Sequence, residues 1–228
     1  MKLDKVVAMI QARMGSTRFP GKVVQPVSGM PLLEIIIRRL RPARAVDELI
    51  VVTSTLEHEG PIVHLCEALG IRCFRGSEED CLDRFYQAAI YAEADVIVRL
   101  TADNPFVDYI FLDQAVDEYY RHTCQYVSSA LSGTYPYGLA VEVMSCTALQ
   151  TAWREAVGPE MREHVTPFIY RNTSRFRTWQ MVNDEPLGHL RFTVDSPEDL
   201  HVVRQIFAHF NGAVDFPWHA AVDLLSAA

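Results

Sequence analysis

The sequence contains no long apolar run. None of its windows approaches the roughly 20 consecutive apolar residues that a membrane-spanning helix needs. The first apolar stretch, residues 6–10, is too short for the hydrophobic region of a secretion signal, and no small-residue cleavage site follows it. We therefore expect a cytoplasmic protein that has no membrane partner.

Cysteine and positive charge are also scarce. Five cysteines are scattered along the 228 residues without a C-x-x-C pair, and the eight histidines include no H-E-x-x-H motif. These absences argue against a disulfide framework and against a zinc site. Lys and Arg number 21 against 29 Asp and Glu, which gives a net charge of −8. A general nucleic-acid binder needs surplus cations for its phosphate contacts, so nucleic acid is not an expected partner.

The first half of the sequence shows a regular alternation of apolar segments typical of strands with segments typical of helices. This alternation predicts an α/β fold, with a mainly parallel, Rossmann-like sheet flanked by helices. In such sheets, ligands bind beyond the carboxyl ends of the strands. The expected strands are residues 6–10, 49–53, 71–74 and 96–100, and the expected helices are 32–40, 61–69 (ended by Gly70), 80–91 and 110–120.

The second half is less regular. Ser196 and Asp199 form the capping-box pattern at the start of a final helix. No linker or internal repeat is visible, so we expect residues 1–228 to form a single domain. The expected strands are 126–130, 139–144, 177–182 and 189–194, and the expected helices are 147–156, 163–170 and 197–210.

The loop after the first strand combines glycines, cations and hydroxyls. Glycine lets a backbone approach phosphate closely, guanidinium groups fork onto phosphate oxygens, and an ammonium adds a point charge. Neither a Walker A loop nor a dinucleotide-binding loop matches the glycine spacing, so the pattern indicates a phosphate loop of another kind. The residues concerned are Arg13, Gly15, Ser16, Thr17, Arg18, Gly21 and Lys22.

Positive charge is concentrated around this loop. Residues 13–44 carry seven Lys and Arg against one acid, Glu34, which favours an anionic ligand. The alternative is a solvated turn followed by a helix whose basic last turn stabilises the helix dipole. That alternative explains Arg38, Arg39 and Arg41 well, but it explains the cations of the loop poorly.

Two aspartates follow expected strands in the same Thr-x-Asp pattern. Asp103 ends the run that begins at Arg99, and Asp195 ends the run that begins at Arg191. Two carboxylates at the ligand side of the sheet suit Mg²⁺, which takes few protein ligands and keeps waters or phosphate oxygens. The alternatives are a turn former for Asp103 and a helix cap for Asp195.

At these residues the chain resembles a known family. Residues 10–22 closely resemble the loop of cytidylyltransferases of the spore coat polysaccharide biosynthesis protein F type. These are relatives of the acylneuraminate and 3-deoxy-manno-octulosonate cytidylyltransferases. Further matches run through nearly the whole chain, at 74–80, 101–103, 138–143, 162–167 and 191–195. The resemblance implies a nucleotide-diphospho-sugar transferase (GT-A-like) fold, CTP as the donor and Mg²⁺ as the cofactor.

The resemblance also implies roles for individual residues. Catalytic roles fall to Arg13, Lys22, Asp103 and Asp195, of which Asp103 and Asp195 would be the metal ligands. The nucleotide would contact Ala12, Arg13, Gly15, Ser16, Arg18, Lys22, Arg75, Ser77, Asp80, Thr101 and Ala102. The acceptor would contact Tyr137, Glu142, Arg162 and His164. The sequence departs from the family pattern at Ala102, Asn104 and Ala140, and Ala140 replaces a usual acidic residue on the acceptor side.

The expected reaction is transfer of CMP from CTP to a sugar, with an acidic keto-sugar favoured, and release of pyrophosphate in surface polysaccharide biosynthesis. The alternatives are a glycosyltransferase of similar fold, a non-catalytic nucleotide-binding subunit and a nucleotidyltransferase for another base. Plain structural roles also stay open: a turn at Arg75 to Ser77, helix-surface positions for Arg162 and His164, and packing for Tyr137. A homodimer is the expected assembly.

Overall fold

A seven-stranded sheet runs through the molecule, for which a computed structural model describes residues 4–226. The strand order is β5-β4-β1-β6-β8-β7-β9, and only β8 runs antiparallel to its neighbours. The predicted mainly parallel α/β fold is therefore confirmed. The strands are β1 (Val6–Gln11), β4 (Glu48–Ser54), β5 (Arg72–Gly76), β6 (Val96–Thr101), β7 (Tyr126–Ser128), β8 (Glu142–Ser145) and β9 (Thr178–Gln180).

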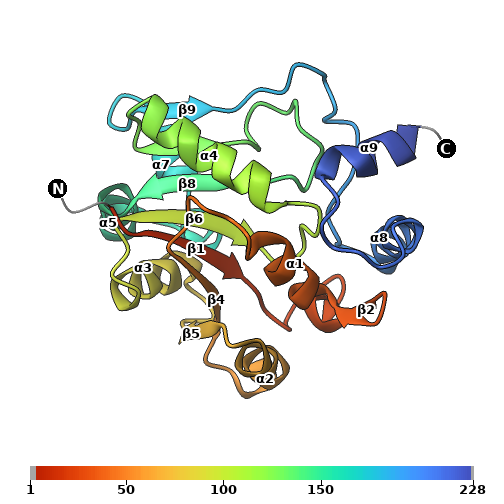
Figure 1. Cartoon of the computed structure of the whole chain (residues 1–228). Coiled ribbons are helices and arrows are strands. Elements are labelled where there is room, and N and C mark those ends of the chain that lie inside the picture. Colours follow the sequence, from red (N-terminus) through yellow and green to blue (C-terminus); the bar gives the residue numbers. More distant parts are fainter. Residues whose placement is uncertain (1–3, 227–228) are drawn as a thin grey trace.

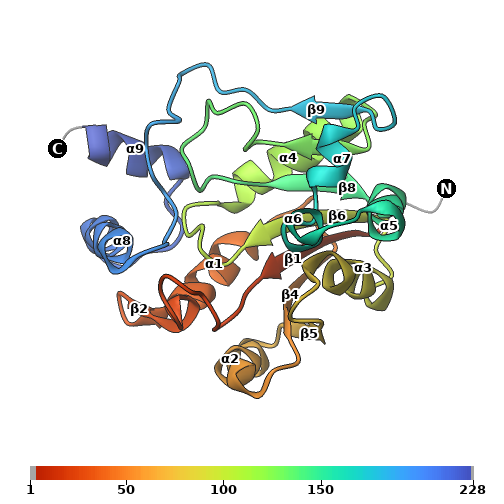
Figure 2. The same cartoon turned by 180° about the vertical axis from the view of Figure 1, so that it is seen from behind.

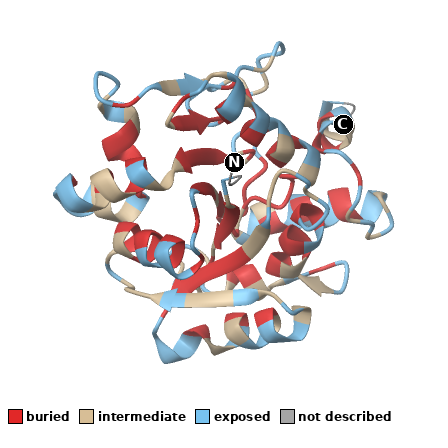
Figure 3. Ribbon diagram, turned by 60° about the vertical axis from the view of Figure 1, so that its left-hand side comes forward, coloured by how far each residue is buried: buried red, intermediate tan, exposed pale blue. Residues whose placement is uncertain are grey.

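Helices cover both faces of the sheet. Alternate residues of a strand point to opposite faces, so Ala8 and Ile10 of β1 join one apolar core while Val7 and Met9 join the other. Helices α1 and α4 cover the first face (Figure 1), and α3 and α5 cover the second (Figure 2). Figure 3 shows buried residues concentrated in the central strands and the inner sides of the helices. The helices are α1 (Leu32–Leu40), α2 (Gly60–Leu69), α3 (Cys81–Tyr91), α4 (Tyr109–Arg121), α5 (Cys146–Glu155), α6 (Pro159–His164), α7 (Pro167–Arg171), α8 (Pro197–His209) and α9 (Trp218–Ser226).

The order of the strands reverses between β1 and β6. From β1 the chain adds β4 and β5 on one side and then crosses to β6 on the other side of β1. The register pairs Gln11 with Thr101, so the carboxyl ends of β1 and β6 lie next to each other. Ligands of open parallel sheets bind at such a reversal, and the phosphate loop and Asp103 both begin there.

Several local predictions are confirmed. The helix expected at 32–40 is α1, and Gly70 ends α2 in the left-handed conformation with φ 64°. The Ser196 side chain accepts a hydrogen bond from the Asp199 N–H, and the Asp199 carboxylate accepts one from the Ser196 N–H, which completes the capping box. Among residues 4–226, no helix has the length and apolar character that spanning a membrane requires.

Two predictions in the second half are wrong, and two elements of the structure were not predicted. The helix expected at 163–170 is broken into α6 and α7, because Val165 adopts φ 69°. Residues 189–194 form no strand, since their backbone bonds to loops instead of a ladder and makes only the single bridge between Tyr137 and Arg191. Helix α9 and the short hairpin of β2 (Pro26–Val27) and β3 (Met30–Pro31) were not predicted.

Candidate active site

Two adjoining cavities open at the carboxyl ends of β1 and β6. The first compartment, of about 270 Å³, is lined mainly by the phosphate loop, and the second, of about 420 Å³, mainly by residues 130–140. Five residues, which we call the shared border, line both compartments. They are Arg18, Thr101, Asp103, His164 and Asp195.

The Lys22 ammonium joins the two predicted aspartates. Its Nζ lies 2.8 Å from Asp103 Oδ2 and 3.2 Å from Asp195 Oδ1, and it donates to the Val194 carbonyl at 2.7 Å. The side chain is almost fully buried. Gly21 makes this placement possible because its φ of 70° turns the loop into the short helix that begins at Lys22.

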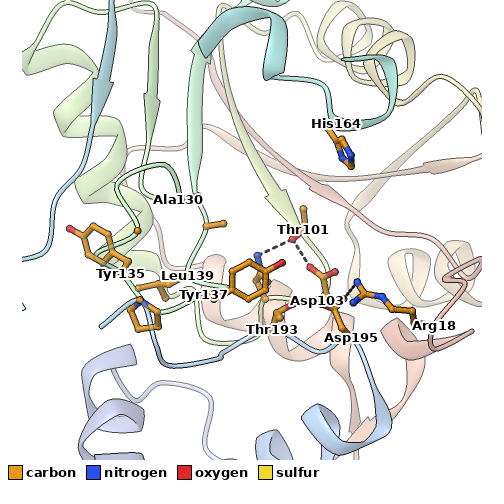
Figure 4. A pocket seen from close by; sticks show the side chains of 16 residues that line it. Arg18, Thr101, Asp103, Ala130, Tyr135, Tyr137, Leu139, His164, Thr193 and Asp195 are labelled. Atoms are coloured by element: carbon orange, nitrogen blue, oxygen red, sulfur yellow. Dashed lines mark hydrogen bonds and ion pairs between the residues drawn. The ribbon is translucent and has the colours of Figure 1, made fainter. Parts of the chain in front are cut away.

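Other polar groups hold the same two carboxylates. The Thr101 hydroxyl donates to Asp103 Oδ1 at 2.6 Å. Arg18 lies 2.9 Å from Asp195 Oδ1 (Figure 4). Arg191 lies 2.8 Å from Asp195 Oδ2. The predicted convergence of the cationic loop with Asp103 and Asp195 is therefore confirmed as geometry, although only Asp103 follows a strand, because residues 189–194 form none.

The two aspartates offer a donor set that fits a small divalent cation. Because one ammonium contacts an oxygen of each carboxylate, both carboxylates can reach a single ion. In the part of the chain from 4 to 226, no group of three or more His, Cys, Asp and Glu side chains forms an all-protein metal cage. Two hard carboxylates with open positions for phosphate oxygens and water are the arrangement that magnesium favours.

Comparison with known proteins decides the family. The sequence model of a family described as cytidylyltransferase matches residues 7–203. The chain belongs to the cytidylyltransferase family. It is a CTP-dependent nucleotidyltransferase, and enzymes of this family generally use a divalent metal ion.

Two curated relatives match this cytidylyltransferase along most of the chain, and a third matches along about half of it. An uncharacterized protein of Methanocaldococcus jannaschii is 37% identical over 91% of this chain and 85% of its own length. The spore coat polysaccharide biosynthesis protein SpsF of Bacillus subtilis is 33% identical over 90% of this chain and 87% of its own length. A 3-deoxy-manno-octulosonate cytidylyltransferase of Geobacter metallireducens is 31% identical over 49% of this chain and 43% of its own length. The solved structure of a cytidylyltransferase from Leptospira borgpetersenii has a TM-score of 0.94 at 28% identity, covering 99% of this chain and 95% of that one.

Arg13, Ser16 and Thr17 of the predicted phosphate loop also line the first compartment, whereas Gly15 and Gly21 line neither compartment. Arg13 lines it and pairs with Glu163 of α6 at 2.9 Å and with Glu78 at 3.6 Å. Ser16 lines it as well, and its hydroxyl accepts a hydrogen bond from the Phe19 N–H at 3.3 Å. The basic residues Arg38, Arg39 and Arg41 lie elsewhere: Arg38 pairs with Glu34 along α1, Arg41 donates to the Leu69 carbonyl, and Arg39 is buried and donates to the Val214 and Phe106 carbonyls.

Three residues predicted to contact the nucleotide, Arg75, Ser77 and Asp80, line neither compartment. Arg75 donates to backbone carbonyls of residues 54–56, and the Ser77 hydroxyl accepts from the Asp80 N–H. Asp80 caps α3 and accepts two hydrogen bonds from Arg162. Their loop follows β5 at the same edge of the sheet as the phosphate loop. Ala12 is buried, and Thr101 and Ala102 line the first compartment.

The four residues predicted at the acceptor divide into two pairs. Tyr137 and His164 line the second compartment, whereas Glu142 and Arg162 line neither. Arg162 donates to Asp80 and to the Trp153 carbonyl, so its guanidinium is committed to protein partners. Direct contact of Arg162 with a substrate carboxylate does not agree with this pairing.

Glu142 is buried and serves the core of the site. Its Oε1 accepts hydrogen bonds from the Tyr126 hydroxyl and, at 2.7 Å, from the Thr166 hydroxyl, and its Oε2 pairs with Arg99. Burial and then the neighbouring Glu142 charge raise the pKa of Tyr126 well above its ordinary value, which keeps the phenol a donor. Burial opposes the charge of Arg99, but Glu142 outweighs it and raises the pKa of Arg99.

Arg191 is a site residue that the sequence reasoning did not single out. It pairs with Asp195 and with Asp199, both at 2.8 Å. The hydrogen bond to Asp199 is the main cause of the raised pKa of Arg191. The spacings of four and eight residues between this arginine and the two aspartates were the available signal.

Proposed function

We propose that this cytidylyltransferase transfers CMP from CTP to a hydroxyl of an acidic keto-sugar, releasing pyrophosphate, with Mg²⁺ held by Asp103 and Asp195. The observation that carries the proposal is the shared border, where the aspartate pair separates a cationic compartment from a larger one beside it. The triphosphate occupies the first compartment and the sugar occupies the second.

The chain's own residues perform most of the work by position and charge. Arg13, Arg18 and Lys22 bind the triphosphate and stabilise the charge that grows on the leaving pyrophosphate. When bound, magnesium neutralises charge on the phosphate oxygens. The sugar hydroxyl attacks the α-phosphorus in line, so the protein needs no covalent intermediate.

The nucleoside belongs beside Ala12 and the loop that contains Arg75, Ser77 and Asp80. Support comes from the position of this loop, which follows β5 at the ligand edge of the sheet. In this proposal the pairing of Asp80 with Arg162 keeps the loop in place, since both side chains are already bonded to each other.

Two features support an acidic sugar as the acceptor. The second compartment is lined by Arg18, whose positive charge can pair with a carboxylate, and by Tyr137, which is 59% exposed and offers a ring face to a sugar. Relatives named for spore coat polysaccharide biosynthesis and for 3-deoxy-manno-octulosonate support the same substrate class and a place in polysaccharide biosynthesis. We propose that residues 1–228 act as one domain and assemble as a homodimer, which light scattering during gel filtration tests.

The test is pyrophosphate release from CTP and Mg²⁺ with a panel of keto-acid sugars. We expect release only when an acceptor is present, and CTP to raise the melting temperature more than ATP, GTP or UTP does. Release from a nucleotide-sugar instead would indicate a glycosyltransferase, and CTP binding without any release would indicate a non-catalytic subunit. In this scheme Asp103→Asn abolishes turnover and leaves the fold intact. The matched control is Asp117→Asn, which changes an exposed aspartate and should leave turnover unchanged. An active Asp103→Asn protein contradicts the proposal.

A further inference from the structure

The attacking sugar hydroxyl must lose its proton at the shared border. Only there do the two compartments meet, so only there can a sugar oxygen reach the α-phosphorus. A group that accepts this proton must have a free lone pair and lie within reach of both compartments. This requirement rests on the proposed function.

Four of the five border residues are already committed. Asp103 and Asp195 each contact the Lys22 ammonium, Arg18 pairs with Asp195, and the Thr101 hydroxyl donates to Asp103. His164 stands apart from these pairs in Figure 4, and within residues 4–226 no hydrogen bond reaches its imidazole. A neutral imidazole has one nitrogen with a free lone pair.

The carboxylates nearest to His164 along α6 have partners of their own. Glu163 pairs with Arg13 at 2.9 Å, and Glu160 pairs with Arg171. Neither carboxylate lines a compartment. The imidazole is therefore the available proton acceptor on this side of the border.

The main chain holds His164 in place through a strained turn. Val165 has φ 69° and ψ −55°, and the Thr166 N–H donates to the His164 carbonyl at 2.8 Å, which together make a γ-turn. This conformation is unfavourable for a β-branched residue, and Val165 is fully buried. Such strain persists only where the surrounding structure holds it, and it occurs preferentially at functional sites.

A buried hydrogen bond holds the turn. The Thr166 hydroxyl donates to Glu142 Oε1 at 2.7 Å, and Arg99 and Tyr126 hold the same carboxylate from the sheet. Glu142 thereby connects the central strands to the turn that carries His164.

We propose that His164 accepts the proton of the attacking hydroxyl, and that Glu142 and Thr166 are positioning residues that hold its turn. The hydroxyl oxygen forms a bond to the α-phosphorus while its proton moves to the imidazole nitrogen, which becomes an imidazolium. The bond between the α-phosphorus and the bridging oxygen breaks, and pyrophosphate leaves with that electron pair. The imidazolium then returns the proton to water.

The test uses His164→Ala with CTP, the metal and the acceptor that the wild type uses. We expect kcat to fall on the order of 10²–10⁴-fold, because general acid–base catalysis contributes that much, with little change in CTP affinity. Free imidazole should restore part of the lost kcat. His201→Ala, an exposed histidine of α8 that lines neither compartment, is the matched control.

The positioning role has its own pair of variants. Thr166→Val removes the hydroxyl but keeps the shape, and we expect kcat to fall about tenfold or more at unchanged CTP affinity. Thr166→Ser keeps the hydroxyl and should retain most of the activity. Equal activity of the two variants overturns the positioning role.

The outcomes separate this inference from the proposed function. A wild type that releases no pyrophosphate with any acceptor rejects both. A wild type that turns over, together with a His164→Ala variant of near-normal kcat, overturns the role of His164 alone. A slow His164→Ala variant that imidazole does not accelerate also overturns proton acceptance by His164.

Discussion

Replacing Lys22 with Met should let the protein bind a divalent cation in the absence of nucleotide. Lys22 holds its ammonium 2.8 Å from Asp103 Oδ2 and 3.2 Å from Asp195 Oδ1, in the position that the cation would take. Methionine keeps most of the apolar stem but removes the positive charge.

The size of the effect follows from Coulomb's law. For the ion to bind the wild type, the Lys22 ammonium must move aside. Two unit charges 4 Å apart in water interact by about 1 kcal/mol, so a divalent ion and an ammonium displaced by about that distance repel by about 2 kcal/mol. Since about 1.4 kcal/mol corresponds to a tenfold change in affinity, Lys22→Met should bind the metal about 30-fold more tightly. The ammonium is nearly buried, and the lower effective dielectric there makes this value a minimum.

The same substitution should destabilise the metal-free protein. Removing one partner of a buried ion pair costs about 3–5 kcal/mol. We expect the lower end of that range, because Asp195 keeps Arg18 and Arg191 and the Asp103 side chain is 26% exposed. Added metal should recover part of the loss, because it binds the folded state.

The assay is titration with Mn²⁺, followed by electron paramagnetic resonance without nucleotide, alongside urea unfolding with and without metal. Lys5→Met is the control. Lys5 lies just before β1, at the end of that strand opposite to the phosphate loop, and pairs with Glu48. The metal affinity of Lys5→Met should equal that of the wild type. If Lys22→Met binds Mn²⁺ no more tightly than the wild type, the ammonium does not occupy the metal position and the reasoning fails.

Two further predictions concern the acceptor compartment and acid stability. Gly138→Ala should raise the acceptor KM at unchanged CTP affinity, because a Cβ there would lie 2.5 Å from the Thr193 nitrogen with φ at +104°. Gly29→Ala, equally strained but in open space, should leave the KM alone, and equal effects of the two would contradict the steric argument. Burial opposes ionisation of Asp199, but hydrogen bonds from Arg191 and from backbone N–H groups outweigh it and lower its pKa. The stability that Asp199 contributes is therefore present at neutral pH and lost as the pH falls below about 4. The free energies of unfolding of wild type and Asp199→Asn, measured in urea, should differ at pH 7 and converge in acid. A difference that stays constant with pH would contradict this.

The sequence predicted those parts of the fold that local patterns determine. Apolar runs with turn residues gave the first four strands and their helices, and strand ends placed Asp103 on the ligand side. The break inside residues 163–170 had a visible signal, since Pro167 lacks an N–H and suits the first turn of a helix, where the structure places it at the start of α7. The apolar periodicity of the segment outweighed that signal, although the broken helix is what presents His164 to the border.

The commitments of individual side chains were not predictable from the sequence. Glu142 meets Arg99 across 43 positions and Arg162 meets Asp80 across 82, so no spacing rule connects them. A family pattern identifies such residues as important without saying whether they touch the substrate. The structure shows that Glu142 and Arg162 bond to other protein groups, and the difference between binding and positioning follows from those bonds.

The charges of the phosphate loop suggest why metal and nucleotide should arrive together. Arg13 is paired with Glu163, Arg18 with Asp195, and Lys22 with both Asp103 and Asp195. A triphosphate can recruit these cations only by taking them from carboxylates, which would then face the phosphate oxygens without compensation. A divalent cation held by Asp103 and Asp195 would remove that cost, and the release of Lys22 from the two aspartates would leave room for it. By reciprocity each ligand would raise the affinity of the other by the same factor, so in the proposed scheme Lys22 is the residue that couples the two.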